Sequence, residues 1–388
     1  MQTQKLLFGI DDLLESHKFS HLHFALVTNN AATTADGTLS RIALLRKGIN
    51  MLKLFSPEHG LTAQGEDGVF QKDSADAVTG LPVISLYGDQ LRPIEEHVID
   101  IDAILFDIPD VGCRFYTYLW TMTYIMEACA ELNKPLFILD RPNLIGGDLS
   151  LAEGPMLDEL SCSSFIGRWS IPVRHSCTLG ELAMYFAATR VKDLDLKINT
   201  VQNWNRKQAV KDPRWFFTSP SPAIRDGETA LLYPGMGLLE GINVNEGRGT
   251  DEPFKIFGAP WIHADQMYEA FNNLKLAGVK AHPLSYEPVA GLYSHEKCHG
   301  LQLNITDASC YRPVRMGLEL INIIASLYPG HCKERLYNTK ANPTGERHLD
   351  KLTGVYDSFK KIKNDQMADL HPDVSNWKET IDPYLLYA

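Results

Sequence analysis

The sequence lacks the features that suit nucleic acid or a lipid bilayer. Acidic residues number 48 against 37 Lys and Arg, and no basic run or arm appears, so we expect neither a nucleic-acid nor an anionic-membrane partner. No apolar run reaches the roughly 18 residues that a membrane span needs. Residues 1–19 predict an amphipathic helix, because Asp11, Asp12 and Glu15 interrupt any signal-peptide core. The chain as given is therefore expected to be soluble and untargeted.

Paired cysteine motifs are also absent from the sequence. Seven cysteines are scattered along the chain without a CxxC spacing, which argues against a structural zinc site or a disulfide scaffold. Buried or inert thiols in a reducing compartment are the expectation. We predict a cytoplasmic protein, whereas a periplasmic or secreted location would follow if a leader had been removed.

Cofactor and metal signatures are missing as well. Neither GxGxxG after the first strand nor GxxxxGK[ST] occurs, which argues against a dinucleotide or nucleoside triphosphate site. The histidines form no HxH or HExxH motif, and no GxSxG nucleophile elbow is present. We predict no cofactor and no metal. One alternative stays open, in which Asp107 and Asp110 hold a divalent cation in a phosphatase or another hydrolase, although helix capping is their more ordinary role.

Short apolar runs alternate with helical stretches over the first 200 residues. Helices are predicted at residues 40–47, 117–133 and 179–189, and strands at residues 24–28, 51–55, 82–88, 103–108, 135–140 and 196–201. Strands and helices alternating at this spacing indicate an α/β fold with a mostly parallel sheet and helices on both faces.

The amino-acid composition changes near residue 215. Residues 215–260 are rich in Pro, Gly and polar residues, which predicts a long structureless segment of functional importance. Beyond it, helices are predicted at 264–276, 314–327, 356–362 and 374–387, and strands at 279–286 and 299–305. We therefore predict two domains, a catalytic α/β domain over 1–225 and a smaller α+β domain over 226–388 that closes the cleft.

Carboxylates follow several of the predicted strands. The strand at 51–55 ends in Ser-Pro-Glu-His-Gly, which places Glu58 and His59 in the loop beyond it. Ligands bind outside the carboxyl ends of strands in open α/β sheets. Asp107, Asp110 and Asp140 occupy similar positions, so several carboxylates could converge on one cleft. Glycoside hydrolysis needs such an acid, with a second carboxylate or the substrate's own acetamido group as its partner.

Other polar residues could complete a sugar site. Arg114, Tyr116 and Tyr118 follow Asp110 closely, and aromatic faces stack on sugar rings while Arg clamps carboxylates. Packing at a helix N-terminus explains them about equally well. His175 ends an extended segment, where a structural role is the commoner one. A further group lies between glycines, where the backbone can approach a ligand closely; it comprises Asn243, Glu246 and Arg248.

Taken together, these stretches resemble the NamZ family of exo-β-N-acetylmuramidases. The matching blocks are, in the family's order, FSPEHG (55–60), TGLPV (79–83), SLYG (85–88), DVG (110–112), RFYTY (114–118), LDRPN (139–143), EGP (153–155), PVRH (172–175), LYPG (232–235), EGRGT (246–250) and FGAPW (257–261). The resemblance implies a Rossmann-like first domain, a smaller second domain, and a cleft between them that releases N-acetylmuramic acid from the non-reducing end of peptidoglycan fragments.

The resemblance also implies roles for individual residues. Glu58 is the expected catalytic acid, and Glu246 is our choice for a second catalytic carboxylate, although assistance from the substrate would need none. Substrate-binding residues are expected to be His59, Asp110, Arg114, Tyr116, Tyr118, His175, Asn243 and Arg248. Arg114 or Arg248 is expected to pair with the lactyl carboxylate of muramic acid. A binding protein that keeps the cleft without turnover is the alternative.

Overall fold

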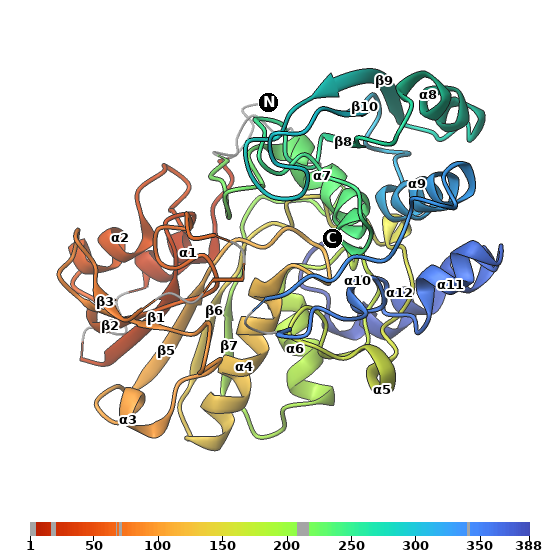
Figure 1. Cartoon of the computed structure of the whole chain (residues 1–388). Helices are drawn as coiled ribbons and strands as arrows, with labels where there is room; N and C mark the ends of the chain where they lie inside the picture. Colours follow the sequence, from red (N-terminus) through yellow and green to blue (C-terminus); the bar gives the residue numbers. More distant parts are fainter. Residues whose placement is uncertain (1–4, 17–20, 67, 70–71, 208–216, 340–341) are drawn as a thin grey trace.

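The computed structural model describes residues 5–16, 21–66, 68–69, 72–207, 217–339 and 342–388 (Figure 1). Within the predicted N-terminal helix, α1 (Gly9–Glu15) is present, and residues 1–4 and 17–19 lie outside the described residues. We divide the chain at the predicted boundary into an N-terminal part, up to residue 225, and a C-terminal part beyond it.

A seven-stranded sheet forms the N-terminal part. Its order is β3-β4-β2-β1-β5-β6-β7, and every neighbouring pair is parallel except the short β3 against β4. The strands are β1 (His23–Thr28), β2 (Asn50–Ser56), β3 (Ser74–Ala75), β4 (Pro82–Ser85), β5 (Ala103–Asp107), β6 (Leu136–Leu139) and β7 (Leu196–Asn199). The mostly parallel α/β sheet predicted from the sequence is confirmed.

Alternate residues of β1 pack into two different cores. Phe24 and Leu26 join a cluster with the buried side chains of α1 and α2 (Ser40–Arg46). Ala25 and Val27 point the other way, into the cluster that contains α4 (Thr117–Glu131) and α6 (Leu179–Thr189). Because side chains alternate across a strand, the two clusters place helices on both faces of the sheet. The remaining elements of this part are α3 (Glu95–Val98), η1 (Leu149–Leu151) and α5 (Glu159–Cys162).

The C-terminal part is built on a smaller, antiparallel sheet in the order β8-β10-β9 (Figure 1). Its strands are β8 (Ile256–Ala259), β9 (Val279–Tyr286) and β10 (Cys298–Ile305). The helical elements are α7 (Gly227–Met236), η2 (Gly237–Gly241), α8 (Ala264–Asn273), α9 (Pro313–Leu327), α10 (His348–Thr353), α11 (Ser358–Lys363), η3 (Met367–Leu370), α12 (Ser375–Ile381) and η4 (Asp382–Tyr384). This agrees with the smaller α+β unit expected there.

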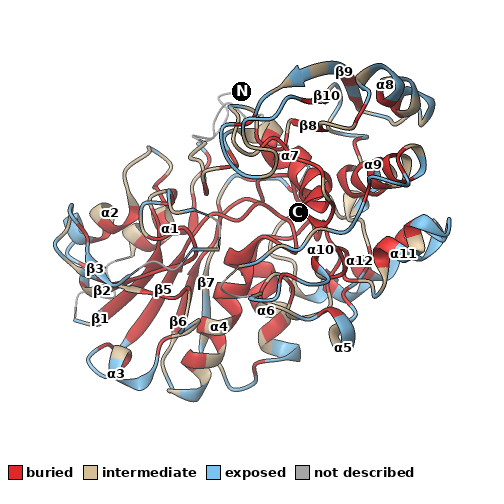
Figure 2. Ribbon diagram, in the orientation of Figure 1, coloured by how far each residue is buried: buried red, intermediate tan, exposed pale blue. Residues whose placement is uncertain are grey.

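The expectation of a structureless segment over 215–260 is wrong. Residues 215–216 lie outside the described residues, but α7, η2 and β8 all fall in this stretch. Figure 2 shows α7 buried in the middle of the molecule, and a helix buried all round has no amphipathic period to reveal it. Its Pro234 and Gly235 suggested a loop. In the structure Gly235 allows α7 to touch α9, since a Cβ there would lie 2.1 Å from the Pro313 carbonyl oxygen.

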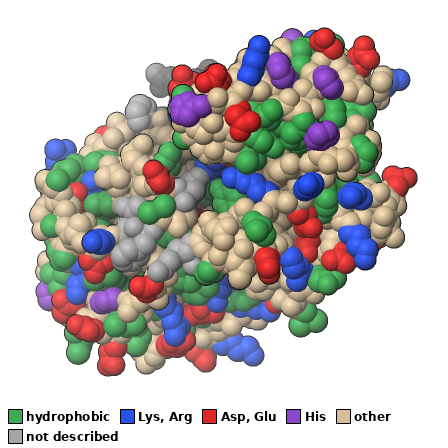
Figure 3. All heavy atoms as spheres, in the orientation of Figure 1, with side chains coloured by type: hydrophobic (Ala, Val, Ile, Leu, Met, Phe, Trp, Pro, Cys, Tyr) green, Lys and Arg blue, Asp and Glu red, His purple; other side chains and the backbone are tan. Residues whose placement is uncertain are grey.

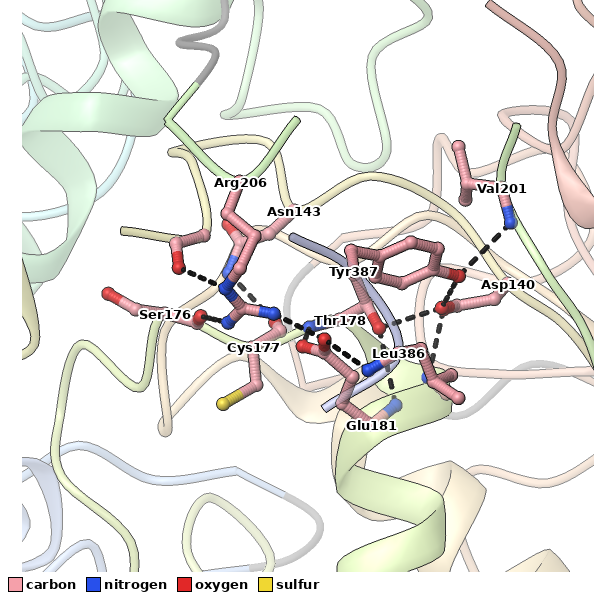
Figure 4. A network of polar contacts seen from close by, with 12 residues as sticks. Asp140, Asn143, Ser176, Cys177, Thr178, Glu181, Val201, Arg206, Leu386 and Tyr387 are labelled. Atoms are coloured by element: carbon pink, nitrogen blue, oxygen red, sulfur yellow. Dashed lines mark hydrogen bonds and ion pairs between the residues drawn. The ribbon is translucent and has the colours of Figure 1, made fainter. Parts of the chain in front are cut away.

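The predicted helix over 374–387 ends early. After η4 the chain turns extended and returns to the large sheet (Figure 4). The Tyr387 hydroxyl donates to Asp140 at 2.5 Å, and the Leu386 amide donates to Glu181 at 3.1 Å. These tertiary partners, which are remote in sequence, override the local helical pattern. The last residues of the sequence thus belong spatially to the N-terminal part, and the boundary at 225 stays a prediction.

Candidate active site

A cavity lies between the N-terminal and C-terminal parts. Figure 3 shows a hollow in the middle of one face, with blue Lys and Arg side chains beside it. Polar groups from both parts line the cavity, among them Glu58, His59, Thr117, Glu240, Arg248 and Lys351. Its ring-bearing walls include Tyr87, Phe115, Tyr116, Phe165, Tyr233 and Phe254. Such a pocket, apolar with a few convergent polar groups, suits a small ligand.

Glu58 occupies the loop that follows β2, where the sequence predicted it. The side chain is 8% exposed, and both carboxylate oxygens are held. The Gly68 N–H donates to Oε1 at 2.9 Å, and the Thr117 hydroxyl donates to Oε2 at 2.7 Å. A backbone N–H can only donate, whereas a hydroxyl can also accept. Thr117 can therefore keep its hydrogen bond when Glu58 carries a proton. A general acid must carry a proton before it transfers it.

Two aromatic rings near Glu58, those of His59 and Tyr118, are held in place by backbone carbonyls. His59 adopts a left-handed backbone (φ 67°), and its Nδ1 contacts the Gly65 carbonyl at 2.9 Å. Because a carbonyl only accepts, Nδ1 carries the proton and Nε2 is the acceptor in the neutral ring. Tyr118 packs edge-on against His59 and donates its hydroxyl to the Pro220 carbonyl at 2.8 Å. Tyr118 is fully buried behind the cavity wall, while Tyr116 lines it.

An ion-pair network forms the opposite wall. Arg248 contacts Glu240 at 2.7 Å and Glu246 at 3.1 Å, and Arg335 contacts Glu246 at 3.5 Å. Glu240 reaches the cavity, whereas Glu246 is 1% exposed and lies outside the lining. Burial favours a higher pKa for Glu240, but Arg248 and His348 outweigh it and hold that pKa well below its usual range. Burial raises the pKa of Glu246, and the charge of Glu240 adds to this. The carboxylate on the cavity surface is therefore the one that stays ionised.

Arg114, predicted as a ligand clamp, faces away from the cavity. Its guanidinium is fully buried and donates to the carbonyls of Pro155 at 2.6 Å, Ile171 at 2.8 Å and Leu352 at 3.0 Å. Burial lowers the pKa of Arg114 to about 10. The Leu352 contact crosses from the N-terminal part to α10, so Arg114 fastens the two sides of the cavity together.

Three other predicted residues also have structural partners. His175 and Asp110 are buried together, with Nε2 and Oδ2 3.7 Å apart. The Asn243 amide donates to the His331 carbonyl at 2.9 Å. Of the ten predicted site residues, the structure gathers four in the cavity lining, namely Glu58, His59, Tyr116 and Arg248. The other six lie outside the lining, namely Asp110, Arg114, Tyr118, His175, Asn243 and Glu246.

Sequence reasoning missed several lining residues. Glu240 lies in η2, inside the stretch that was expected to be structureless, and Lys351 lies in α10, a helix that was not predicted. Thr117 was seen only as the start of a helix. A Glu eight residues before an Arg is no recognised motif, so only the fold brings Glu240 and Arg248 together.

The crevice used by dinucleotides in such sheets contains an arginine in this protein. It lies beyond β1 and β5, where the strand order reverses. Arg141 there contacts both oxygens of Asp107, at 2.6 and 3.0 Å, and also donates to the Thr33 carbonyl. Both Asp107 oxygens are thus occupied, which weakens the cation alternative. Within the described ranges no three His, Cys, Asp or Glu side chains group in a way that could hold a metal ion.

The fold and the cavity define a class of protein. The cavity combines a carboxylate at the end of a parallel strand with a second carboxylate and walls of aromatic rings. These features are typical of an enzyme that cleaves sugars. The chain belongs to the NamZ exo-β-N-acetylmuramidase family. Residues 24–228 match the family's N-terminal domain, and residues 231–387 match its C-terminal domain.

Individual relatives agree with this family. The chain is 40% identical over 329 residues to the peptidoglycan β-N-acetylmuramidase NamZ of Bacillus subtilis (strain 168), covering 84% of this chain and 78% of that protein. Two DUF1343 family proteins of Bacteroides fragilis NCTC 9343, known from crystal structures, share the fold. One superposes with a TM-score of 0.88 at 28% identity, and the other with 0.76 at 26%; each comparison covers 99% of both chains.

Proposed function

We propose that this protein is an exo-acting glycoside hydrolase that releases N-acetylmuramic acid from the non-reducing end of peptidoglycan fragments. One observation carries the proposal: in a chain that matches the NamZ family along both its parts, Glu58 reaches a ring-lined cavity with both its oxygens held in place. The cavity is walled by both parts of the chain, which suits the capture of a terminal sugar rather than the middle of a strand.

Glu58 is the proposed acid. Its proton moves to the glycosidic oxygen while the bond from C1 to that oxygen breaks and the electron pair leaves with the oxygen. Water supplies the hydroxyl group that C1 gains, and the proton released from water restores the acid. Gly68 and Thr117 orient the carboxyl group for this transfer.

Glu240 is the carboxylate that we propose for the positive charge developing at C1, in place of the predicted Glu246. Three observations support Glu240: it lines the cavity, its side chain is only 7% exposed, and Arg248 keeps it ionised. Glu246 lies behind Arg248 and reaches no cavity surface, so it acts by holding that arginine in place. A fixed negative oxygen in a site shielded from water stabilises such a charge more strongly than one in open solvent.

The substrate is a small muramic-acid saccharide or muropeptide, taken up without a cofactor or a nucleic-acid partner. We propose a cytoplasmic role in the recycling of wall fragments. The cysteines support a reducing compartment, since all seven are unpaired and six are buried. The part of the chain that the structure describes contains no helix long and apolar enough to cross a membrane.

The test is hydrolysis of a chromogenic β-N-acetylmuraminide beside the matching β-N-acetylglucosaminide, with and without EDTA. Wild type should cleave the muraminide alone and should be insensitive to EDTA. Glu58→Gln should lose at least about 100-fold in kcat, while the exposed control Glu95→Gln should match wild type. Full activity in Glu58→Gln would refute the assignment of the acid. Binding of muramic acid without turnover by wild type would identify a binding protein instead.

A further inference from the structure

The cationic side chains of the cavity wall differ in how their charge is compensated. Arg248 forms ion pairs with two carboxylates, Glu240 and Glu246, so its charge is already compensated. Lys351 also lines the cavity, but its ammonium group donates only to uncharged oxygens: Asn342 Oδ1 at 2.6 Å and the Glu346 carbonyl at 3.1 Å. No carboxylate among the described residues lies within ion-pair distance of Lys351, although the charges of Glu346 and Asp350 act on it from further away. The cavity therefore holds a cation without a direct acidic partner.

The surroundings of Lys351 hold it in place. It lies on α10, where Asp350 accepts the amide of Ser358 at 2.8 Å and pairs with Arg347 at 2.9 Å. The following residue, Leu352, accepts from the buried Arg114. Burial lowers the pKa of Lys351 and the nearby charge of Arg347 adds to this, while Glu346 and Asp350 oppose it only in part, so an incoming anion would favour the charged lysine.

Lys351 is also close to the proposed acid through a short chain of contacts. Its partner Asn342 lines the cavity together with Thr339. Thr339 packs on Gly68, since a Cβ on that glycine would lie 2.9 Å from the Thr339 side chain. The Gly68 amide in turn holds Glu58. Lys351 thus lines the same cavity as Glu58, from the C-terminal part, and its ammonium group is held by Asn342, another lining residue.

We propose that Lys351 binds the lactyl carboxylate that distinguishes N-acetylmuramic acid from N-acetylglucosamine, and so sets the specificity of the site. This inference rests on the proposed function. It replaces the two arginines suggested by the sequence, because Arg114 faces away from the cavity and Arg248 already has two acidic partners. A charged hydrogen bond of this kind is expected to change kcat/KM on the order of 10- to 100-fold.

The test removes the charge from each partner in turn. Wild type and Lys351→Met are assayed on the chromogenic muraminide and on its lactyl methyl ester, which has no carboxylate charge. Wild type should lose 10- to 100-fold in kcat/KM on the ester, mainly through KM, whereas Lys351→Met should be slow on both and should not distinguish them. Lys351→Arg should keep part of the preference. The exposed control Lys378→Met should behave like wild type.

Three results would overturn the proposal: equal rates of wild type on acid and ester, unchanged activity of Lys351→Met on the acid, or an undiminished preference for the acid in that variant. If Lys351→Met does not fold, Lys351→Gln serves, and the wild-type comparison of acid and ester still decides. If wild type turns over neither substrate, the proposed function fails separately. Binding of free N-acetylmuramic acid by wild type and Lys351→Gln then tests the lysine, and equal affinity would refute it.

Discussion

Thr117, the first residue of α4, donates its hydroxyl to Glu58 Oε2 at 2.7 Å across 59 positions of sequence. Its neighbour Tyr118 contacts the backbone carbonyl of Glu58 at 3.4 Å. The start of one helix therefore fixes both ends of the proposed acid.

Thr117→Val should reduce kcat about tenfold and leave KM nearly unchanged, since it removes the hydroxyl that orients Glu58 but no substrate contact. Steady-state kinetics on the muraminide measures the effect. Thr117→Ser keeps the hydroxyl and should retain most of the activity. A change confined to KM would show that Thr117 contacts the substrate instead of positioning the acid.

The sequence predicted six of the seven strands of the large sheet, all but the exposed two-residue strand β3 (Ser74–Ala75), because most of these six are apolar runs that end near Pro or Gly. Glu58 was found for the same reason: the strand that precedes it ends sharply at Ser56. The roles of Arg114 and Glu246 were harder to assign. Both lie next to motif residues in sequence, but whether a side chain turns into a cavity or behind its wall depends on packing. Partners that are remote in sequence, such as Pro155 and Arg335, leave no local pattern.

The C-terminal contribution to the cavity was the least predictable. Glu240 lies in a short 3-10 helix, and Lys351 lies in a helix of six residues, too short for an amphipathic period. Both are carried to the cavity by contacts with remote elements. The α7 helix was not predicted because Pro234 indicated a loop. In the structure Pro234 lies within α7, which packs against α9.

Stability should depend on pH through Asp140. Burial raises the pKa of Asp140 well above its ordinary value, to about 6. The folded state therefore binds the proton more tightly than the unfolded state. This contribution to stability is complete below the unfolded pKa and is lost as pH rises through the folded value. The free energy of unfolding should fall by about 3 kcal/mol between about pH 4 and 6.

Denaturant unfolding at a series of pH values measures this dependence. Asp140→Asn mimics the protonated acid, since its amide oxygen can accept from Gly180 while its N–H donates to the hydroxyls of Thr178 and Tyr387. The variant should lack the decrease seen in wild type. An identical pH dependence in the two proteins would assign the titration to another group.

Tyr387 should anchor the end of the chain. Its hydroxyl donates to Asp140 and accepts from the Val201 amide at 3.0 Å, so Tyr387→Phe removes one hydrogen bond from each of two buried partners. We expect a loss of about 1–3 kcal/mol in the free energy of unfolding. Tyr384→Phe is the control, since the described residues offer its hydroxyl no hydrogen bond. Equal stability of the two variants would mean that water replaces the lost contacts.

The choice between Glu240 and Glu246 can be made from pH profiles. Arg248 keeps Glu240 ionised against the effect of burial, so Arg248→Met should let the pKa of Glu240 rise. If ionised Glu240 is needed, the acid limb of kcat/KM should move up by at least about one pH unit in this variant. Glu240→Gln should lose activity at every pH.

Arg335 provides the matched comparison, because it contacts Glu246 at 3.5 Å and forms no ion pair with Glu240 among the described residues. Arg335→Met should leave the acid limb where wild type has it. If Arg335→Met moved the limb and Glu240→Gln kept its activity, the required carboxylate would be Glu246. Glu246, which does not reach the cavity, would then act on the substrate indirectly, through Arg248. The structure favours the first outcome, because only Glu240 has a surface that a sugar in the cavity can touch.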